Sequence, residues 1–261
     1  MENIRIKPVW PKSKETIWNE MFEHIDEQTS VQGRKIRFQG RIPLWGYAAG
    51  FLIPLLLACH FYTVTTETAN GEQTVVLLPD RSTVTLNVAG KLSYNPIEWF
   101  VSRKVKLEGE AYFDVRHGSR FCVQSGCNRV YVLGTTFNVY ARQEMYRVTC
   151  LTGKVAVHAG GSSAVLNPDM QATFRDRKLS IDSDVTPDVA TGWMQGMFVF
   201  VERPLQEVLA EVERQYNIHI SPASPISPTN TYTGIFSKTG NSPEDVIKVI
   251  SKALGITLRI E

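Results

Sequence analysis

The chain has 261 residues, with 28 Lys and Arg against 26 Asp and Glu, and a formal net charge of +2 at pH 7. This near balance excludes the basic footprint of a nucleic-acid-binding protein at the level of the whole chain. The five histidines are scattered without the spacing of metal ligands, so no metal site is expected.

The first predicted element is a helix over residues 13–28. Apolar residues recur on one side of it, and these stripe residues are Ile17, Trp18, Met21, Phe22 and Ile25. A single helix cannot bury such a stripe alone, so it needs another chain, a second copy or a membrane surface. A partly disordered tail is the alternative.

Residues 42–62 form a run of 21 residues without Asp, Glu, Lys or Arg. As a helix the run would rise about 31 Å, close to the thickness of one hydrocarbon core. It therefore predicts a single transmembrane helix that divides a short arm, 1–41, from a long one. The alternatives are a buried core helix and a cleaved signal peptide.

Charge predicts the orientation of this span. Basic residues precede it without an acid among them, namely Arg34, Lys35, Arg37 and Arg41, while the first charges after it are Glu67 and Glu72. Basic flanks stay in the cytoplasm. We therefore expect the N-terminus in the cytoplasm and residues 63–261 outside it.

Residues 63–180 predict an all-β domain, because short β-rich runs alternate there with Gly, Asn, Asp and Pro clusters. A sandwich, a roll or a short β-solenoid would fit. Residues 104–115 alternate clearly, with one apolar face and one charged face. Residues 121–130 predict a hairpin turning at Ser125–Gly126. Its Cys122 and Cys127 are the favoured disulfide pair, against the alternative of separate small core residues.

Two features of this domain could carry chemistry. Glu108, Glu110 and Asp114 share the charged strand face, and paired carboxylates can hydrolyse glycosides, although a solvated surface is the simpler interpretation. At Gly134–Thr135, a Thr hydroxyl could attack the preceding carbonyl if the backbone were strained, with an ordinary strand position as the alternative. The chain contains no nucleophile elbow, phosphate loop or dinucleotide fingerprint, so no cofactor and no enzymatic turnover are expected.

Residues 181–192 are polar and predict a linker. Residues 193–261 contain an internal repeat, in which Gly196-Met197-Phe198 corresponds to Gly234-Ile235-Phe236. Each copy predicts strand, helix and strand, with helices over 204–216 and 242–254 packed on one sheet. The expected fold class is thus mainly β plus α+β, with an N-terminal helix, one transmembrane helix, an all-β domain and a two-layer βαβ-βαβ domain.

The β domain resembles the FecR family of bacterial transmembrane regulators. The resemblance rests on three blocks in order: 78–94 with LPDRSTVTLN, 103–115 with RKVKLEGEAYFDV, and 132–139 with VLGTTFNV. The C-terminal repeat resembles the domain that often follows FecR domains. The residues that carry this second resemblance are Trp193, Gly196, Phe198, Phe200, Pro204-Leu205, Val208-Leu209 and Tyr216.

The resemblance implies an inner-membrane anti-sigma factor. Its cytoplasmic arm would hold an extracytoplasmic-function sigma factor through the stripe residues. Its periplasmic arm would contact the signalling domain of a TonB-dependent outer-membrane transporter, with Phe200, Ile235 and Phe236 as candidate contacts. Some relatives cleave themselves, and Gly134–Thr135 is the corresponding position.

The chain departs from the family pattern in three places. Its cytoplasmic arm is shorter than usual, the LPDGS turn has Arg81 in place of Gly, and Asp169 stands where a Pro-Gly turn is common. The short arm leaves a second hypothesis open, in which the protein is a membrane-anchored periplasmic adaptor without a sigma factor. An enzyme acting on periplasmic glycan is the third.

Overall fold

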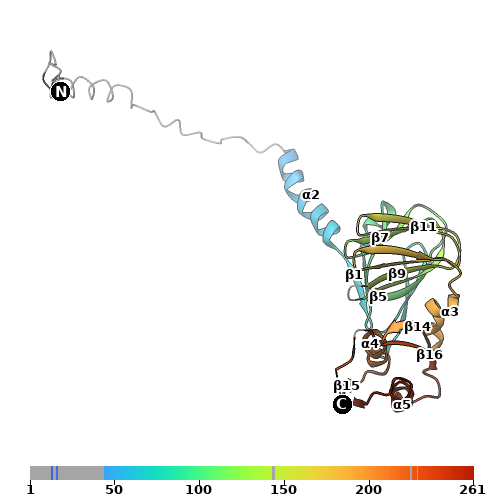
Figure 1. Ribbon diagram of the computed structural model, residues 1–261. Helices are drawn as coiled ribbons and strands as arrows, with labels where there is room; N and C mark the ends of the chain where they lie inside the picture. Colours follow the sequence, from blue (N-terminus) through green and yellow to red (C-terminus); the bar gives the residue numbers. More distant parts are fainter. Residues whose placement is uncertain (1–12, 14–15, 17–43, 143–144, 224, 228) are drawn as a thin grey trace, which may run out of the picture. The chain divides into compact units, whose positions relative to one another are not determined.

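The computed structural model describes residues 13, 16, 44–142, 145–223, 225–227 and 229–261 (Figure 1). The stripe residues Ile17, Trp18, Met21, Phe22 and Ile25 lie outside the described residues. Contacts between residues divide the chain at Phe51–Leu52, and the domains described below all lie in the unit Leu52–Glu261.

The first described helix, α2, covers Leu44–Phe61 within the predicted 42–62 run. Within the described residues, no helix combines the length and the apolar character that crossing a bilayer requires. The membrane span remains a prediction from the sequence.

Of the strands that follow α2 in the described part of the chain, the first thirteen belong to the β domain. They are β1 (Val64–Glu67), β2 (Thr74–Leu77), β3 (Thr83–Leu86), β4 (Lys91–Tyr94), β5 (Arg103–Asp114), β6 (Phe121–Ser125), β7 (Asn128–Val132), β8 (Thr136–Arg142), β9 (Met145–Cys150), β10 (Val155–Ala159), β11 (Ser162–Leu166), β12 (Gln171–Arg175) and β13 (Lys178–Asp182). A short 3-10 helix, η1 (Glu98–Phe100), precedes β5.

The strands form two sheets that share β5. The first sheet has the order β1-β4-β5-β6-β7-β10-β11, and the second has the order β2-β3-β5-β8-β9-β12-β13. Only the β5–β6 pair is parallel among these described pairs. Side chains of both sheets, such as Phe121 and Phe137, belong to one hydrophobic cluster. Of the predicted architectures, a sandwich describes this arrangement best.

The long strand β5 changes sheets at its middle. Residues up to Glu108 pair with β4 or β6, and residues from Gly109 onward pair with β3 or β8. Gly109 has a φ of +102°, and a Cβ there would lie 2.8 Å from the Cα of Gly90. Glycine is therefore required by conformation and by space.

The predicted hairpin is present as β6 and β7, but its disulfide prediction is wrong. Cys122 is buried and pairs across the ladder with Tyr131, whereas Cys127 lies exposed in the turn. All four cysteines are free in the part of the chain that the structure describes. Ladder register places the two thiols at different levels of the hairpin, so the turn cannot bring them together.

The region predicted as a linker contains the end of β13 and a short helix, α3 (Pro187–Thr191), and a 3-10 helix, η2 (Gly192–Gln195), begins there. The repeated strand–helix–strand order that follows is confirmed. Its elements are β14 (Met197–Pro204), α4 (Leu205–Tyr216), β15 (Ile220–Pro222), β16 (Thr231–Ser237), α5 (Pro243–Leu254) and β17 (Leu258–Ile260). Ser242 caps α5 through a capping box with Asp245.

The expected single sheet of the C-terminal domain is wrong, because its strands form two separate pairs. β14 pairs with β16, and β15 pairs with β17. β14 ends at Pro204 and α4 begins at Leu205, so no loop turns the helix back to place β15 beside β14. Both helices bury their apolar faces in one cluster that includes Leu205, Val208 and Ile250.

Candidate functional site

A cluster of buried polar side chains lies where the β domain meets α4, and we call it the polar cluster. Its members are Asn87, Glu110, Asn138 and Arg142 of the β domain and Glu211, Arg214 and Gln215 of α4, all buried except the partly buried Arg214. Buried charges are costly unless they are hydrogen-bonded and paired. A cluster of this size therefore marks a position where structure or function requires polarity.

Asn87 connects the two sides of the polar cluster. It follows β3 and is completely buried. Its Nδ2 donates to Glu110 Oε2 at 2.8 Å, and its Oδ1 accepts from Gln215 Nε2 at 3.2 Å. Gln215 Nε2 also donates to Glu211 Oε1 at 2.8 Å. The two amides, of Asn87 and Gln215, thereby link a carboxylate of the β domain to a carboxylate of α4.

The two carboxylates differ in their electrostatic surroundings. Burial raises the pKa of Glu110, and the negative charge of Glu211 raises it further. Burial alone would raise the pKa of Glu211 too, but the positive charges of Arg214 and Arg142 outweigh it and lower that pKa. Arg214 donates to Glu211 Oε2 at 2.7 Å, which fixes the ionised form.

Arg142 binds the polar cluster to the backbone of the β domain. Its Nη1 donates to the carbonyl of Ala89 at 3.0 Å, and its Nη2 donates to the carbonyl of Val88. Its positive charge lies close enough to both carboxylates to oppose the rise in the pKa of Glu110 and to lower the pKa of Glu211.

Glu110 is buried, which corrects the expectation that it lies on a solvated strand face. Its neighbours Glu108 and Asp114 on the same strand are exposed, as expected. Alternation places Glu110 on the outer face of β5, where the C-terminal domain covers it. Both of its oxygens accept amide hydrogen bonds, from Asn87 and from Asn138 at 2.9 Å. This carboxylate is held in a structural network rather than presented to a glycan.

Further bonds join the same two domains. Gln73 Nε2 donates to the Trp193 carbonyl at 3.0 Å, the Gly71 amide donates to the Arg214 carbonyl at 2.8 Å, and Arg175 pairs with Glu207 at 3.0 Å. With the polar cluster, they hold the two domains in one arrangement.

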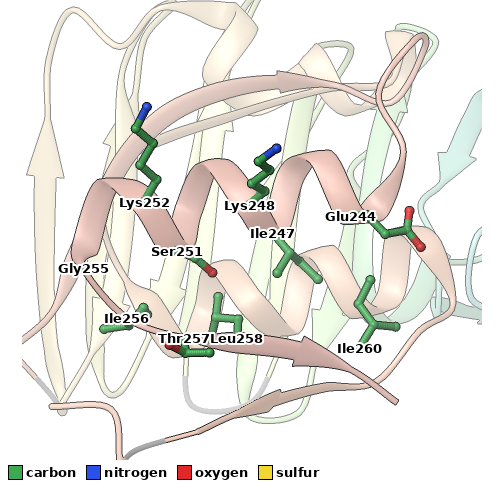
Figure 2. A pocket seen from close by; sticks show the side chains of 10 residues that line it. All are labelled: Glu244, Ile247, Lys248, Ser251, Lys252, Gly255, Ile256, Thr257, Leu258 and Ile260. Atoms are coloured by element: carbon green, nitrogen blue, oxygen red, sulfur yellow. The ribbon is translucent and has the colours of Figure 1, made fainter.

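The C-terminal domain also carries a groove of about 660 Å³ between α5 and β17 (Figure 2). Figure 2 shows Ile247 and Ser251 on the side of α5 that faces the last strand, while Lys248 and Lys252 project from the other side. An apolar floor with a charged rim suits a protein segment better than a small polar substrate.

The predicted transporter contacts divide into core and surface residues. Phe200 and Phe236 are buried, with ring centroids 6.2 Å apart, whereas Ile235 is 70% exposed on β16. Ile235 lies opposite Val199, and Val201 on the same pair of strands is exposed as well. Of the three predicted contacts, only the Ile235 side chain is therefore available to another protein.

Gly134 and Thr135 lie between β7 and β8. A Cβ on Gly134 would lie 2.6 Å from the Cα of His117, so the backbone here is closely packed. The Thr135 side chain is buried, and its Oγ1 has no hydrogen-bond partner among the described residues. A buried hydroxyl without a partner is unusual in a folded protein.

Over the described ranges, no group of three His, Cys, Asp or Glu side chains is placed to hold an ion.

The roles of Asn87, Arg142 and Gln215 in the polar cluster were not predicted from the sequence. Asn87 and Gln215 are separated by 128 positions, and short polar residues at the end of a strand normally indicate a turn. The one available signal was Glu110, a carboxylate within a strand of otherwise regular alternation.

Comparisons with known proteins agree with this domain arrangement. Residues 64–156 match the family model described as FecR protein, and residues 197–261 match the one described as FecR, C-terminal. A comparison with curated proteins finds no match.

Two crystal structures of a candidate anti-sigma factor from Parabacteroides distasonis ATCC 8503 are similar to this chain. Both have a TM-score of 0.70 and 30% sequence identity. The structure at 2.50 Å covers 77% of this chain and 95% of that chain, and the one at 1.65 Å covers 76% and 95%.

Proposed function

The chain belongs to the FecR family, and from this premise we propose that it is a transmembrane anti-sigma factor. It couples a TonB-dependent outer-membrane transporter to an extracytoplasmic-function sigma factor. The observation that carries the proposal is the similarity across both extracytoplasmic domains to 95% of a candidate anti-sigma factor.

We place the protein in the inner membrane, with residues 1–41 in the cytoplasm and residues 63–261 in the periplasm. The support is the charge-free run over 42–62 and the basic residues directly before it. Reporter fusions at both ends test this topology, and two reporters active in the same compartment would contradict it.

The cytoplasmic arm holds the sigma factor through the stripe residues. Affinity purification of the full chain from detergent-solubilised membranes should retain an extracytoplasmic-function sigma factor, identified by mass spectrometry. The double variant Met21→Asp/Ile25→Asp should lose it, because two charges disrupt the apolar contact face. The control Glu20→Ala, on a polar position, should retain it.

The alternative function is a periplasmic adaptor without a sigma factor, and the short arm favours it. Replacing residues 1–33 with an unrelated tail separates the two functions. Unchanged signalling after this replacement supports the adaptor, while loss of regulation supports the anti-sigma factor.

The C-terminal domain receives the transporter through the β14–β16 face around Ile235. Binding there moves α4, since β14 continues directly into that helix. Because the polar cluster bonds α4 to the β domain, a shift of α4 displaces the β domain and, through it, the end of α2. This route requires no catalysis, only two arrangements of one interface.

Ile235→Asp should weaken binding of the transporter's signalling domain to the full chain by about tenfold, because it places a charge in an apolar contact. Val165→Asp is the control, since Val165 is exposed on β11 of the other domain. Equal binding by both variants would show that the transporter does not bind at Ile235, and the α5–β17 groove would then be the next candidate.

We further propose self-cleavage between Gly134 and Thr135, which the unpartnered Thr135 hydroxyl favours. The hydroxyl oxygen attacks the Gly134 carbonyl carbon, the peptide C–N bond breaks, and an ester with a free amine remains. Water then hydrolyses the ester. The halves stay paired, because β8 after the cut remains bonded to β5 before it.

Two variants test the cleavage. Thr135→Ala should give only the intact chain on a denaturing gel, while the wild type gives fragments ending at 134 and beginning at 135. Thr136→Ala is the control, because the Thr136 hydroxyl already contacts the Thr152 hydroxyl at 2.8 Å. Fragments from Thr135→Ala would contradict the mechanism.

A further inference from the structure

The loop over residues 95–102 exposes an apolar surface beside the end of α2. Phe100 is 93% exposed and Val101 is 92% exposed, and Ile97 is also exposed. Single exposed apolar residues are common, but two adjacent ones with almost complete exposure require an explanation.

The loop is rigidly mounted on the β domain. Trp99, between the exposed residues, is buried and packs edge-on against Tyr94 and Phe121 at 5.5 and 5.9 Å. The exposure of Phe100 and Val101 is therefore built into the fold, since their neighbour is fixed in the core.

The same loop is fastened to the last turn of α2. Asn95 Nδ2 donates to the carbonyls of Cys59 and His60 at 3.0 and 2.9 Å. Its Oδ1 accepts from the amides of Ile97 and Glu98, and the Glu98 carboxylate contacts the His60 ring. One side chain thus ties the start of the loop to the end of the helix.

Basic residues surround this junction. A depression of about 320 Å³ is lined by Lys104 and Lys106 of β5 together with His60 and Phe61 of α2. Both lysines are exposed, and Phe61 itself is 73% exposed. The nearest carboxylate in the depression, Glu98, is engaged by His60.

We propose that the 95–102 loop is a membrane-docking element. Phe100 and Val101 enter the periplasmic leaflet of the bilayer, and Lys104 and Lys106 contact its phosphate head groups. This inference rests on the proposed membrane location of α2. If α2 ends at the membrane surface, Asn95 holds the loop at the same depth, where apolar side chains gain by leaving water and cations gain from anionic lipid. The docked loop fixes the β domain to the membrane.

Photocrosslinking of the full chain in nanodiscs of phosphatidylcholine and phosphatidylglycerol tests this element. p-Benzoylphenylalanine is placed at one position at a time: at Phe61 to report the helix end, at Phe100 to report the loop, and at Ile235 as the exposed control. Mass spectrometry detects phospholipid adducts. We expect adducts at Phe61 and Phe100 and none at Ile235.

The outcomes separate this inference from the proposed location. An adduct at Phe61 without one at Phe100 overturns the docking element and leaves the membrane location standing. No adduct at either position overturns both.

The lysines are tested by Lys104→Glu/Lys106→Glu with the probe at Phe100. The adduct yield should fall in the anionic nanodiscs and stay unchanged in phosphatidylcholine alone. A variant yield in the anionic nanodiscs equal to that of the chain with both lysines overturns the head-group contact.

Discussion

At the scale of single residues, eight non-glycine positions in the described part of the chain have a positive φ, and two of them lie in turns of the β domain that the sequence analysis singled out. Arg81 has a φ of +66° and Asp169 a φ of +65°. These are the two turn positions where the sequence departs from its family. The turns are kept, and the departures cost local backbone strain.

Replacing Arg81 with glycine should therefore stabilise the protein. We expect Arg81→Gly to raise the free energy of unfolding by about 0.5–1 kcal/mol, because the relief of strain exceeds the added entropy of the unfolded chain. Asp169→Gly should gain less, since Asp tolerates this conformation better than Arg. Thermal unfolding of both variants tests the order, and a larger gain at Asp169 would contradict it.

Asp80, beside Arg81, forms the principal ion pair of the β domain. Its Oδ2 accepts from Arg103 Nε at 2.8 Å, and Arg103 is buried. Burial raises the pKa of Asp80, but the bonds from Ser82 and the charge of Arg103 lower it below its ordinary value near 3.8. The ionised form is the one that the fold stabilises.

Asp80→Asn should cost about 3 kcal/mol, because it leaves a buried guanidinium without its counter-ion. A lowered carboxyl pKa contributes stability that is complete above the unfolded pKa and disappears as the pH falls through the folded value. Below pH ~4, wild-type stability should therefore fall toward that of the variant. Glu67→Gln, which removes an exposed partner of Lys91, should leave stability unchanged.

At the scale of elements, β5 organises the β domain by serving both sheets. Alternation over 104–115 predicted this strand correctly, because one face of it is apolar throughout. Periodicity carries no information about partners, so the change of sheet at Gly109 was not predicted.

Gly109→Ala should destabilise the protein by more than about 3 kcal/mol, because a Cβ meets backbone at 2.8 Å and the φ is unfavourable. Gly126→Ala is the matched control. Gly126 also has a positive φ, of +58°, but has no atom within 4 Å of a new Cβ. Its cost should stay near 1 kcal/mol. Equal losses of unfolding free energy at both sites would show that the cost comes from the backbone conformation and not from the close contact at Gly109.

At the scale of the whole molecule, the polar cluster joins the β domain to the C-terminal domain. The family and both domains were recognisable from local sequence blocks. The interface was not, because it depends on contacts between residues far apart in the chain, as Asn87 and Gln215 are. The alternation that placed Glu110 on an outer face was correct, but it could not show that a second domain covers that face.

A double-mutant cycle measures this junction. Asn87→Ala and Gln215→Ala should each destabilise the chain, and together they should cost about 1 kcal/mol less than the sum, because they remove one shared bond. Asn87→Ala combined with Ser242→Ala is the control. Ser242 bonds to Asp245 instead, so these effects should add. Additive effects in both cycles would show that Asn87 and Gln215 have no measurable coupling free energy.

The shared strand also sets an order of assembly. β5 receives β3 and β4 on one edge, from earlier in the chain, but its other edge waits for β6 and β8. During synthesis, this second edge of β5 stays open in the first sheet until Ser125 has been made, and in the second sheet until Arg142 has been made. Chains truncated before Arg142 should therefore be digested faster by an added protease than the full chain.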